Sequence, residues 1–219
     1  MPFHEPGSRD WRANRRIFLR LIAPLAVAFC AAILLVRHNG KSVWKLVSDP
    51  TAALHASPLL GFFSNLGILG WCTGAAVALF AAWVLARGRA PRPVVRFHLG
   101  AGLFTALLMV DDFFLIHDAL APRYLHLSQN AVYAVYALAF AGFITSCRRE
   151  LRARNPALFT IAVGLLGFMA GIDAMVSGYS RYVSLAMSGS KFLGIACWSA
   201  WLVLNAQRDL EAAQASGEP

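Results

Sequence analysis

Six apolar segments, each about as long as a membrane-spanning helix, constrain the fold of this chain most strongly. A helix needs roughly 20 predominantly apolar residues to cross a hydrocarbon core of about 30 Å. Hydrophobic residues make up 58% of the sequence and charged residues only 14%, which excludes an ordinary soluble domain. We therefore predict an all-α integral membrane protein with a bundle of six transmembrane helices. The predicted spans cover residues 17–36, 59–85, 97–116, 131–147, 157–176 and 183–204.

The positions of the basic residues predict the orientation of this bundle. Most of the 20 Lys and Arg residues fall on one side of the six spans. Short loops rich in Arg stay in the cytoplasm, so both termini are predicted to be cytoplasmic. The sixth segment carries Lys191 and several serines, and if it does not span, the C-terminus lies on the opposite side. The basic side holds Arg9, Arg12, Arg15, Arg16, Arg20, Arg87, Arg89, Arg92, Arg96, Arg148, Arg149, Arg152, Arg154 and Arg208.

The sequence divides into three parts. Residues 1–16 form a basic cytoplasmic arm, residues 17–204 the six-helix transmembrane domain, and residues 205–219 a polar tail that we expect to be frayed. The net charge of +9 indicates attraction to anionic lipid at the cytoplasmic face. It does not indicate nucleic-acid binding, because no soluble segment is large enough to form a basic face. The Ala- and Arg-rich composition suggests the plasma membrane of a bacterium, that is, its inner membrane.

Small residues are expected to act in packing. The four cysteines lack CxxC spacing and are predicted to be small, buried packing residues without a disulfide or zinc framework. Glycines in the second and fifth spans are predicted to let helix backbones approach closely. These glycines are Gly61, Gly67, Gly70, Gly74, Gly164, Gly167 and Gly171.

Two adjacent carboxylates, Asp111 and Asp112, lie near the end of the third span, where charge is costly. The predicted orientation places them roughly 7 Å below the outer boundary, because a helix rises about 1.5 Å per residue. Asp173 of the fifth span and Lys191 of the sixth fall in the same outer half of the membrane, and His117 lies just beyond the third span. We therefore predict an outer-leaflet cluster with Asp111, Asp112, Asp173 and Lys191 as candidate catalytic residues.

The charges of this cluster require partners, because buried charges are paired, bound to metal or neutralised by a proton. Three carboxylates face one cation, Lys191, which we expect to pair with Asp111 or Asp173. Three solutions stay open: a divalent metal such as zinc, protonated carboxyl groups that exchange protons, or arginines from the membrane surface in an inert salt-bridge network. The candidate metal ligands are Asp111, Asp112, His117 and Asp173.

Helix geometry and position in the spans suggest how the residues in and around this cluster are arranged. Helical spacing turns Asp112 about 100° away from Asp111, and it sets His117 on yet another side unless the helix unwinds before it. Tyr133 and Tyr136 open the fourth span and are expected to be interfacial aromatics. His98, at the start of the third span, is expected to be interfacial as well.

Three function classes are compatible with this sequence. We favour a non-catalytic or sensory membrane subunit that acts through a protein partner. The alternatives are an intramembrane metal-dependent hydrolase of a lipid or lipid-linked substrate, and a proton- or cation-coupled transporter. The residue types resemble those of helical membrane hydrolases of the alkaline ceramidase type, but the chain lacks their HxxxH pair and also lacks HExxH and GxSxG. The sequence therefore leaves open whether the protein is an enzyme.

Overall fold

The computed structural model describes residues 18–40, 42–44, 48, 50–57, 59–154, 156–175 and 180–215. The chain forms two compact units, residues 1–60 and 61–219, which are described separately. Several predicted features lie outside the described residues: the basic arm 1–16 with the first residue of the first span, residues 176–179 at the end of the fifth span and beyond it, and the end of the tail, 216–219.

Among its described residues, the first unit contains one long apolar helix. A single π-helical segment, η1 (Phe18–Ile22), leads into α2 (Ala23–His38), and a short helix α4 (Pro50–Ala53) follows. Pro24 stands in the first turn of α2, where its missing N–H leaves no hydrogen bond unmade. With 16 residues, α2 alone is shorter than the other apolar helices, although η1 and α2 together cover most of the predicted first span.

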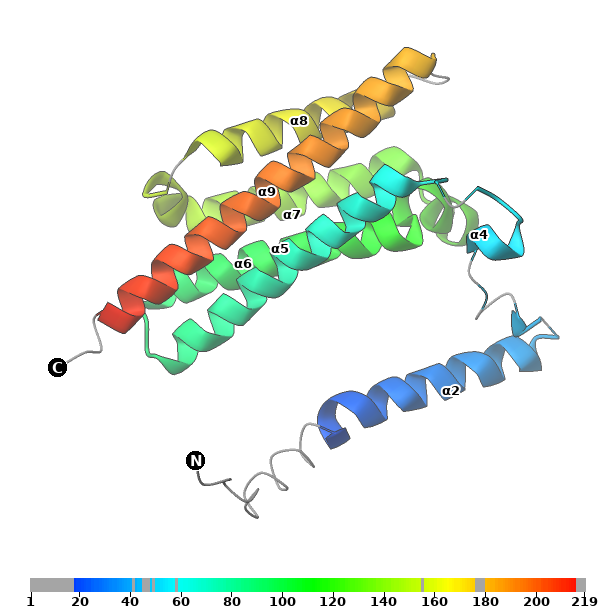
Figure 1. The fold of residues 1–219 in the computed structure, drawn as a ribbon, viewed down its shortest axis with the longest axis horizontal. Coiled ribbons are helices and arrows are strands. Elements are labelled where there is room, and N and C mark those ends of the chain that lie inside the picture. The colour runs from blue at the N-terminus through cyan, green and yellow to red at the C-terminus, as the bar shows by residue number, and fades with distance from the viewer. Residues whose placement is uncertain are drawn as a thin grey trace, which may run out of the picture. The chain divides into compact units, whose positions relative to one another are not determined.

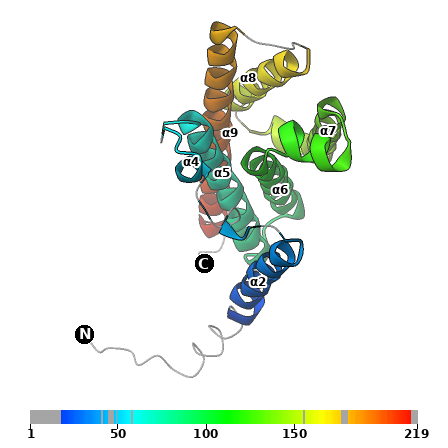
Figure 2. The same cartoon turned by 90° about the vertical axis from the view of Figure 1, so that its right-hand side faces the viewer.

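The second unit is a ring of five long helices. They are α5 (Phe62–Arg87), α6 (Arg92–Phe114), α7 (Gln129–Arg152), α8 (Pro156–Met175) and α9 (Arg181–Ala215). Each helix contacts the next one along the chain, and α9 closes the ring against α5 (Figures 1 and 2). All five are long and apolar enough to cross a membrane, and the described residues contain no strand. The described part of the chain is therefore all-helical, and five of the predicted spans are present as helices long and apolar enough to cross a membrane.

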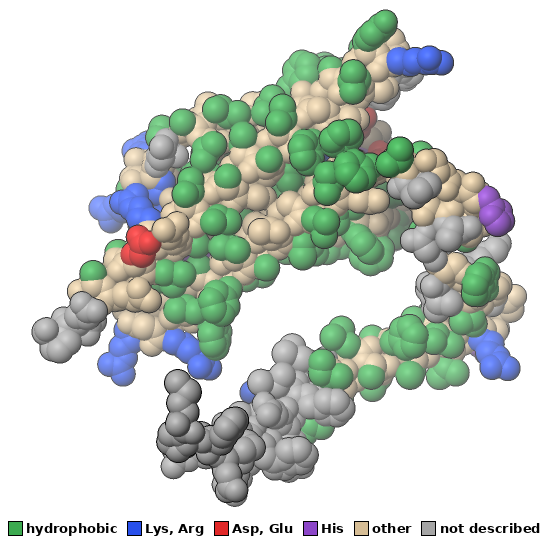
Figure 3. Space-filling view, viewed as in Figure 1, with side chains coloured by type: hydrophobic (Ala, Val, Ile, Leu, Met, Phe, Trp, Pro, Cys, Tyr) green, Lys and Arg blue, Asp and Glu red, His purple; other side chains and the backbone are tan. Residues whose placement is uncertain are grey.

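Successive helices of the ring run in opposite directions (Figure 1), and residues 115–128, between α6 and α7, form the longest connection. One end, here called the arginine end, carries the basic residues of the α5–α6 and α7–α8 connections. The other end, the cluster end, carries the C-termini of α6 and α8 and the N-termini of α7 and α9. On the face shown in Figure 3, hydrophobic side chains are spread over the middle of the ring, and the visible Lys and Arg side chains lie at the helix ends. This distribution is the one expected for a bundle that faces lipid.

Close packing between α5 and α9 depends on glycine, as predicted for Gly67, Gly70 and Gly74 of the second span. The prediction is wrong for Gly61, which precedes α5 with a φ of 71° and would meet no described atom within 4 Å of a Cβ. A Cβ atom on Gly70 would lie 2.9 Å from Cγ2 of Ile195, and one on Gly74 would lie 3.1 Å from Oγ of Ser199. The prediction is wrong for the fifth span: Cβ atoms on Gly164, Gly167 and Gly171 would meet no atom of the described chain within 4 Å. These three glycines of α8 therefore do not serve helix contact.

Two further expectations differ from the structure. All four cysteines are free, as expected, but only Cys147 is buried, whereas Cys30 and Cys72 are exposed on their helices. The tail was expected to fray from Asn205, yet α9 continues to Ala215. The helix continues because Asn205 and Ala206 are buried against the rest of the ring, which stabilises it beyond its apolar part.

A buried polar network fastens the arginine end. Arg154, which follows α7, donates from Nη2 to Oδ2 of Asp209 at 2.7 Å and from Nη1 to Oδ1 of Asn205 at 2.9 Å. Nε2 of His98 lies 2.7 Å from the same Asp209 oxygen. The guanidinium also lies over the ring of Phe97, 3.8 Å from its centroid. His98 is completely buried and is not the interfacial residue that we expected.

Candidate functional site

The third predicted span ends at a break directly after the Asp pair. α6 ends at Phe114, and Leu115 takes a left-handed conformation with φ of 51°, which is uncommon for a residue other than glycine. A π-helical segment, η2 (Ile116–Leu125), follows and ends at His126, which is also left-handed. The backbone N–H of His117 donates to Oδ1 of Asp111 at 2.9 Å, so the carboxylate holds the chain where it leaves the helix.

Asp111 and His117 form a buried pair through this break. Nδ1 of His117 lies 2.5 Å from Oδ2 of Asp111. The hydroxyl of Tyr136 on α7 donates to Oδ1 of the same carboxylate at 2.7 Å. Asp111 thus accepts hydrogen bonds at both oxygens, and it sets the orientation of the imidazole ring. Because the helix unwinds before His117, the side chain reaches Asp111 despite its place in the sequence.

Asp112 forms a second pair that points to different helices. Lys191 of α9 donates from Nζ to Oδ1 of Asp112 at 2.6 Å, and the indole Nε1 of Trp71 on α5 donates to Oδ2 at 2.9 Å. Lys191 therefore pairs with Asp112. The sequence had led us to expect Asp111 or Asp173 as its partner, and that prediction is wrong. Lys191 reaches Asp112 because α9 packs directly against α5, and Asp112 contacts residues of both helices.

Asp173 of α8 lies near the start of α7. Its Oδ2 accepts hydrogen bonds from Nε2 of Gln129 at 2.6 Å and from the hydroxyl of Tyr133 at 2.5 Å. Ser128 caps α7 by accepting from the backbone N–H of Ala131 at 3.2 Å, which fixes where this helix begins. Tyr133 and Tyr136 thus bind carboxylates of the cluster and are not the interfacial aromatics expected from the sequence.

Inside the ring, a cavity of about 400 Å³ opens beside these residues. At its polar end lie Asp111, Asp112, His117 and Lys191. The remaining wall is almost entirely apolar. It is built from aromatic side chains of α6, α7 and α9 and from small residues of α8, including Phe104, Phe140, Trp198, Gly167, Ala170 and Gly171. The open space beside two of the α8 glycines is therefore cavity, which explains why they touch no neighbouring helix.

The pKa values of two residues of η2, His117 and Asp118, are shifted by their surroundings. Burial opposes the charged form of His117, but its hydrogen bond to Asp111 and the nearby carboxylates of Asp118 and Asp112 raise its pKa above the ordinary value of 6.5. Burial also raises the pKa of Asp118, against the effect of His117, and Asp173 adds to this rise. The environment thus favours a proton on the imidazole.

This shift predicts a pH-dependent stability. Because the folded-state pKa of His117 lies above the unfolded value, its contribution is complete below about pH 6.5 and is lost as the pH rises through the folded-state pKa. We expect the difference in free energy of unfolding between the wild type and His117→Gln to shrink over that rise. Denaturation in detergent at a series of pH values measures it. A difference that grew with pH would contradict the assignment.

The structure brings the predicted site residues to one end of the ring but divides them into separate groups. Asp111 contacts His117, Asp112 contacts Lys191, and Asp173 contacts the start of α7. The four predicted metal ligands therefore do not converge on one point. Sequence reasoning also did not identify Trp71, Gln129, Tyr133 and Tyr136 as partners, since nothing in their spacing distinguishes them from ordinary interfacial or core residues.

Comparisons with known proteins place the chain in a family without assigning an activity. Neither the curated proteins nor the solved structures provide a match. A family model does match, described as a domain of unknown function, DUF8692, and the match covers residues 21–204. The matched range includes α2, α5 to α8 and α9 up to residue 204, together with every residue of the cluster end discussed above. Because this is most of the 219-residue chain, the protein belongs to the DUF8692 family.

Proposed function

We propose that this protein binds one amphiphilic lipid-like molecule in the ring cavity and acts as a non-catalytic, sensory membrane subunit. The observation that carries the proposal is the division of the cavity: its wall is apolar, and its charged residues gather at the cluster end. A volume of about 400 Å³ lies within the usual range for ligand pockets, which is roughly 300–1,000 Å³. A bilayer amphiphile presents the same division, with its tail in hydrocarbon and its head at the membrane surface.

The proposed topology places this head group in the outer leaflet. In our proposal, α2 with η1 is a sixth span, both termini are cytoplasmic and the arginine end faces the cytoplasm of a bacterial cell, where it attracts anionic lipid. The supporting observation is the arginine content of the α5–α6 and α7–α8 connections. The cluster end then lies on the outer side, at the depth where a lipid head group meets water. A protein partner would bind differently to the form whose cavity holds the amphiphile and to the form whose cavity is empty.

Filling the cavity tests this proposal. Gly171 lines the cavity and has open space at its Cβ position, so Gly171→Phe should place a ring inside the cavity without striking a neighbouring helix. We expect native mass spectrometry of the purified wild type to show a bound amphiphile and the variant to lose it. Gly164→Phe is the matched control, because Gly164 lies on the same helix with the same open space but does not line the cavity. Equal lipid content in the two variants would refute the proposal.

A second candidate function is hydrolysis of the same kind of lipid. The observation that favours it is the Asp111–His117 pair, in which a carboxylate orients an imidazole at the cavity wall, as in general-base catalysis of water attack. Incubation with a labelled lipid extract should then release a product from the wild type and none from His117→Gln, while His126→Gln retains the activity. The transport alternative gains no such specific contact among the described residues.

A further inference from the structure

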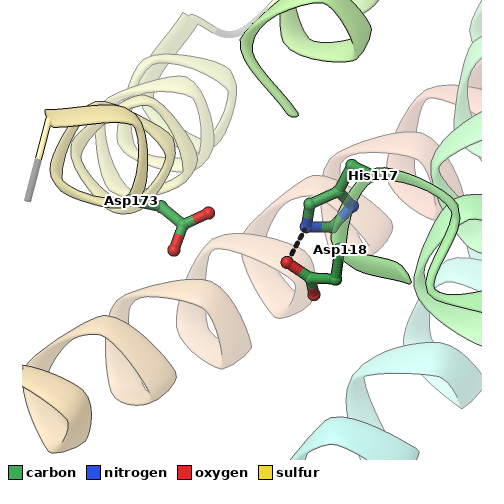
Figure 4. Close-up of side chains that lie close together, drawn as sticks. All are labelled: His117, Asp118 and Asp173. Atoms are coloured by element: carbon green, nitrogen blue, oxygen red, sulfur yellow. Dashed lines mark ion pairs between the residues drawn. The ribbon is translucent and has the colours of Figure 1, made fainter. Parts of the chain in front are cut away.

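Three potential metal ligands converge at the cluster end, and one of them, His117, also lines the cavity. His117, Asp118 and Asp173 each offer one ligand atom, and these atoms all lie within 4.8 Å of one another (Figure 4). Two ligands of one zinc ion lie roughly 3–4 Å apart, given bond lengths of about 2.0–2.2 Å. A small adjustment therefore brings the three groups to coordination distance. Asp118 can supply it, because half of its side chain is exposed and η2 is not packed as a regular α-helix.

The orientation of His117 turns Nε2 toward a carboxylate, a position that either a proton or a metal ion can occupy. Asp111 accepts from Nδ1, so in the neutral imidazole that nitrogen carries the proton and Nε2 carries the lone pair. Nε2 lies 3.3 Å from Oδ1 of Asp118. A lone pair and a carboxylate oxygen repel each other at this distance unless a proton or a metal ion lies between them. His117 is only 8% exposed, so bulk water does not readily relieve the repulsion.

The surroundings hold these groups in place. A metal-bound histidine typically donates its other ring N–H to a carboxylate, which fixes its tautomer and orientation. Asp111 has that position here, and Tyr136 and the His117 backbone hold Asp111 in turn. Gln129 and Tyr133 do the same for the Asp173 carboxylate. Each of the two more buried ligands is therefore oriented by hydrogen bonds from outside the group of three.

We propose that His117, Asp118 and Asp173 bind one divalent cation of the zinc type, with Asp111 as the positioning residue. One imidazole and two carboxylates suit zinc or a neighbouring first-row metal, whereas Mg²⁺ and Ca²⁺ prefer oxygen ligands alone. This set replaces the ligands predicted from the sequence: Asp118 enters, Asp111 moves to the supporting role, and Asp112 remains with Lys191. Since His117 also lines the cavity, the cation would face the head group of a bound amphiphile.

Zinc titration of the purified, tag-free protein tests the site. After chelator treatment, we expect the wild type to bind one equivalent of zinc in competition with a chromophoric chelator. Asp118→Asn and Asp173→Asn should lose stoichiometric binding. Asp111→Asn should keep the stoichiometry but bind about 10- to 100-fold more weakly, as found for residues that orient metal ligands. The control is His126→Gln, an exposed histidine at the end of η2, which should bind like the wild type.

Two readouts separate this inference from the proposed function. The Co²⁺ absorption spectrum of the wild type should show nitrogen and oxygen coordination, and Asp118→Asn should abolish that spectrum while its thermal unfolding stays unchanged. Gly171→Phe should still bind zinc, because coordination by His117, Asp118 and Asp173 does not require lipid in the cavity. Absence of zinc binding by the wild type, or wild-type zinc affinity in Asp118→Asn and Asp173→Asn, would overturn the metal site and leave lipid binding untouched.

Discussion

Replacing Arg154 with Met is expected to lower the free energy of unfolding by about 3–5 kcal/mol, the usual cost of removing one partner from a buried ion pair. The side chain of Arg154 is only 3% exposed and holds both Asp209 and Asn205. Its loss leaves the Asp209 carboxylate with His98 alone, and it removes the cation from the face of Phe97. Denaturant unfolding in detergent, followed by the fluorescence of the core tryptophans, measures the change.

The matched control for this prediction is Arg152→Met, two residues earlier. Arg152 is exposed at the end of α7, so its replacement should change the free energy of unfolding by less than about 0.5 kcal/mol. Arg154→Lys keeps the charge but cannot contact Asp209 and Asn205 through two nitrogens of one plane, and it should fall between the two. If Arg154→Met behaved like Arg152→Met, the network would not fasten the arginine end.

The second large effect is expected at the other end of the ring. Asp112→Leu leaves Nζ of Lys191 and Nε1 of Trp71 without their acceptor, which should cost about 3 kcal/mol. We take the lower end of the usual range because the side chain of Lys191 is 27% exposed. Trp71→Phe, which removes only the neutral donor, should cost about 1 kcal/mol in hydrogen bonding.

A double-mutant cycle separates the pair from its surroundings. Adding Lys191→Met to Asp112→Leu removes the unpaired ammonium, so the double variant should be more stable than Asp112→Leu alone. The coupling energy should lie between about 0.5 and 3 kcal/mol, as for residues in direct contact. Additive losses would show that Asp112 and Lys191 do not interact in the membrane protein, and the pairing described here would then be wrong.

Local properties of the chain predicted the helices well. Runs of apolar residues are visible in any sequence, and the five long helices follow the predicted spans, with α5 at Phe62–Arg87 against the predicted 59–85. The end of α9 was missed because its stability comes from burial of Asn205 against other helices, which hydropathy does not contain. Six spans and the cytoplasmic position of the termini stay predictions.

The contacts of the cluster were less predictable because they depend on which helices are neighbours. The angle of about 100° between Asp111 and Asp112 agrees with their different partners on α7 and α9. Nothing in the sequence, however, shows that α9 lies against α5, and so the partner of Lys191 was misassigned. The break at Leu115 was equally hidden, since a leucine gives no sign of a left-handed turn.

The break after α6 concentrates much of the charge of the cluster in one short stretch. Asp111, Asp112, His117 and Asp118 fall within eight consecutive residues, yet their side chains turn toward three different helices, α7, α9 and α5, and toward η2 itself. The stretch has a fixed spacing, in which four residues separate the Asp-Asp pair from the His-Asp pair. Deleting one of the four intervening residues would separate the histidine from its carboxylate, so the cluster depends on this spacing as much as on the residue types themselves.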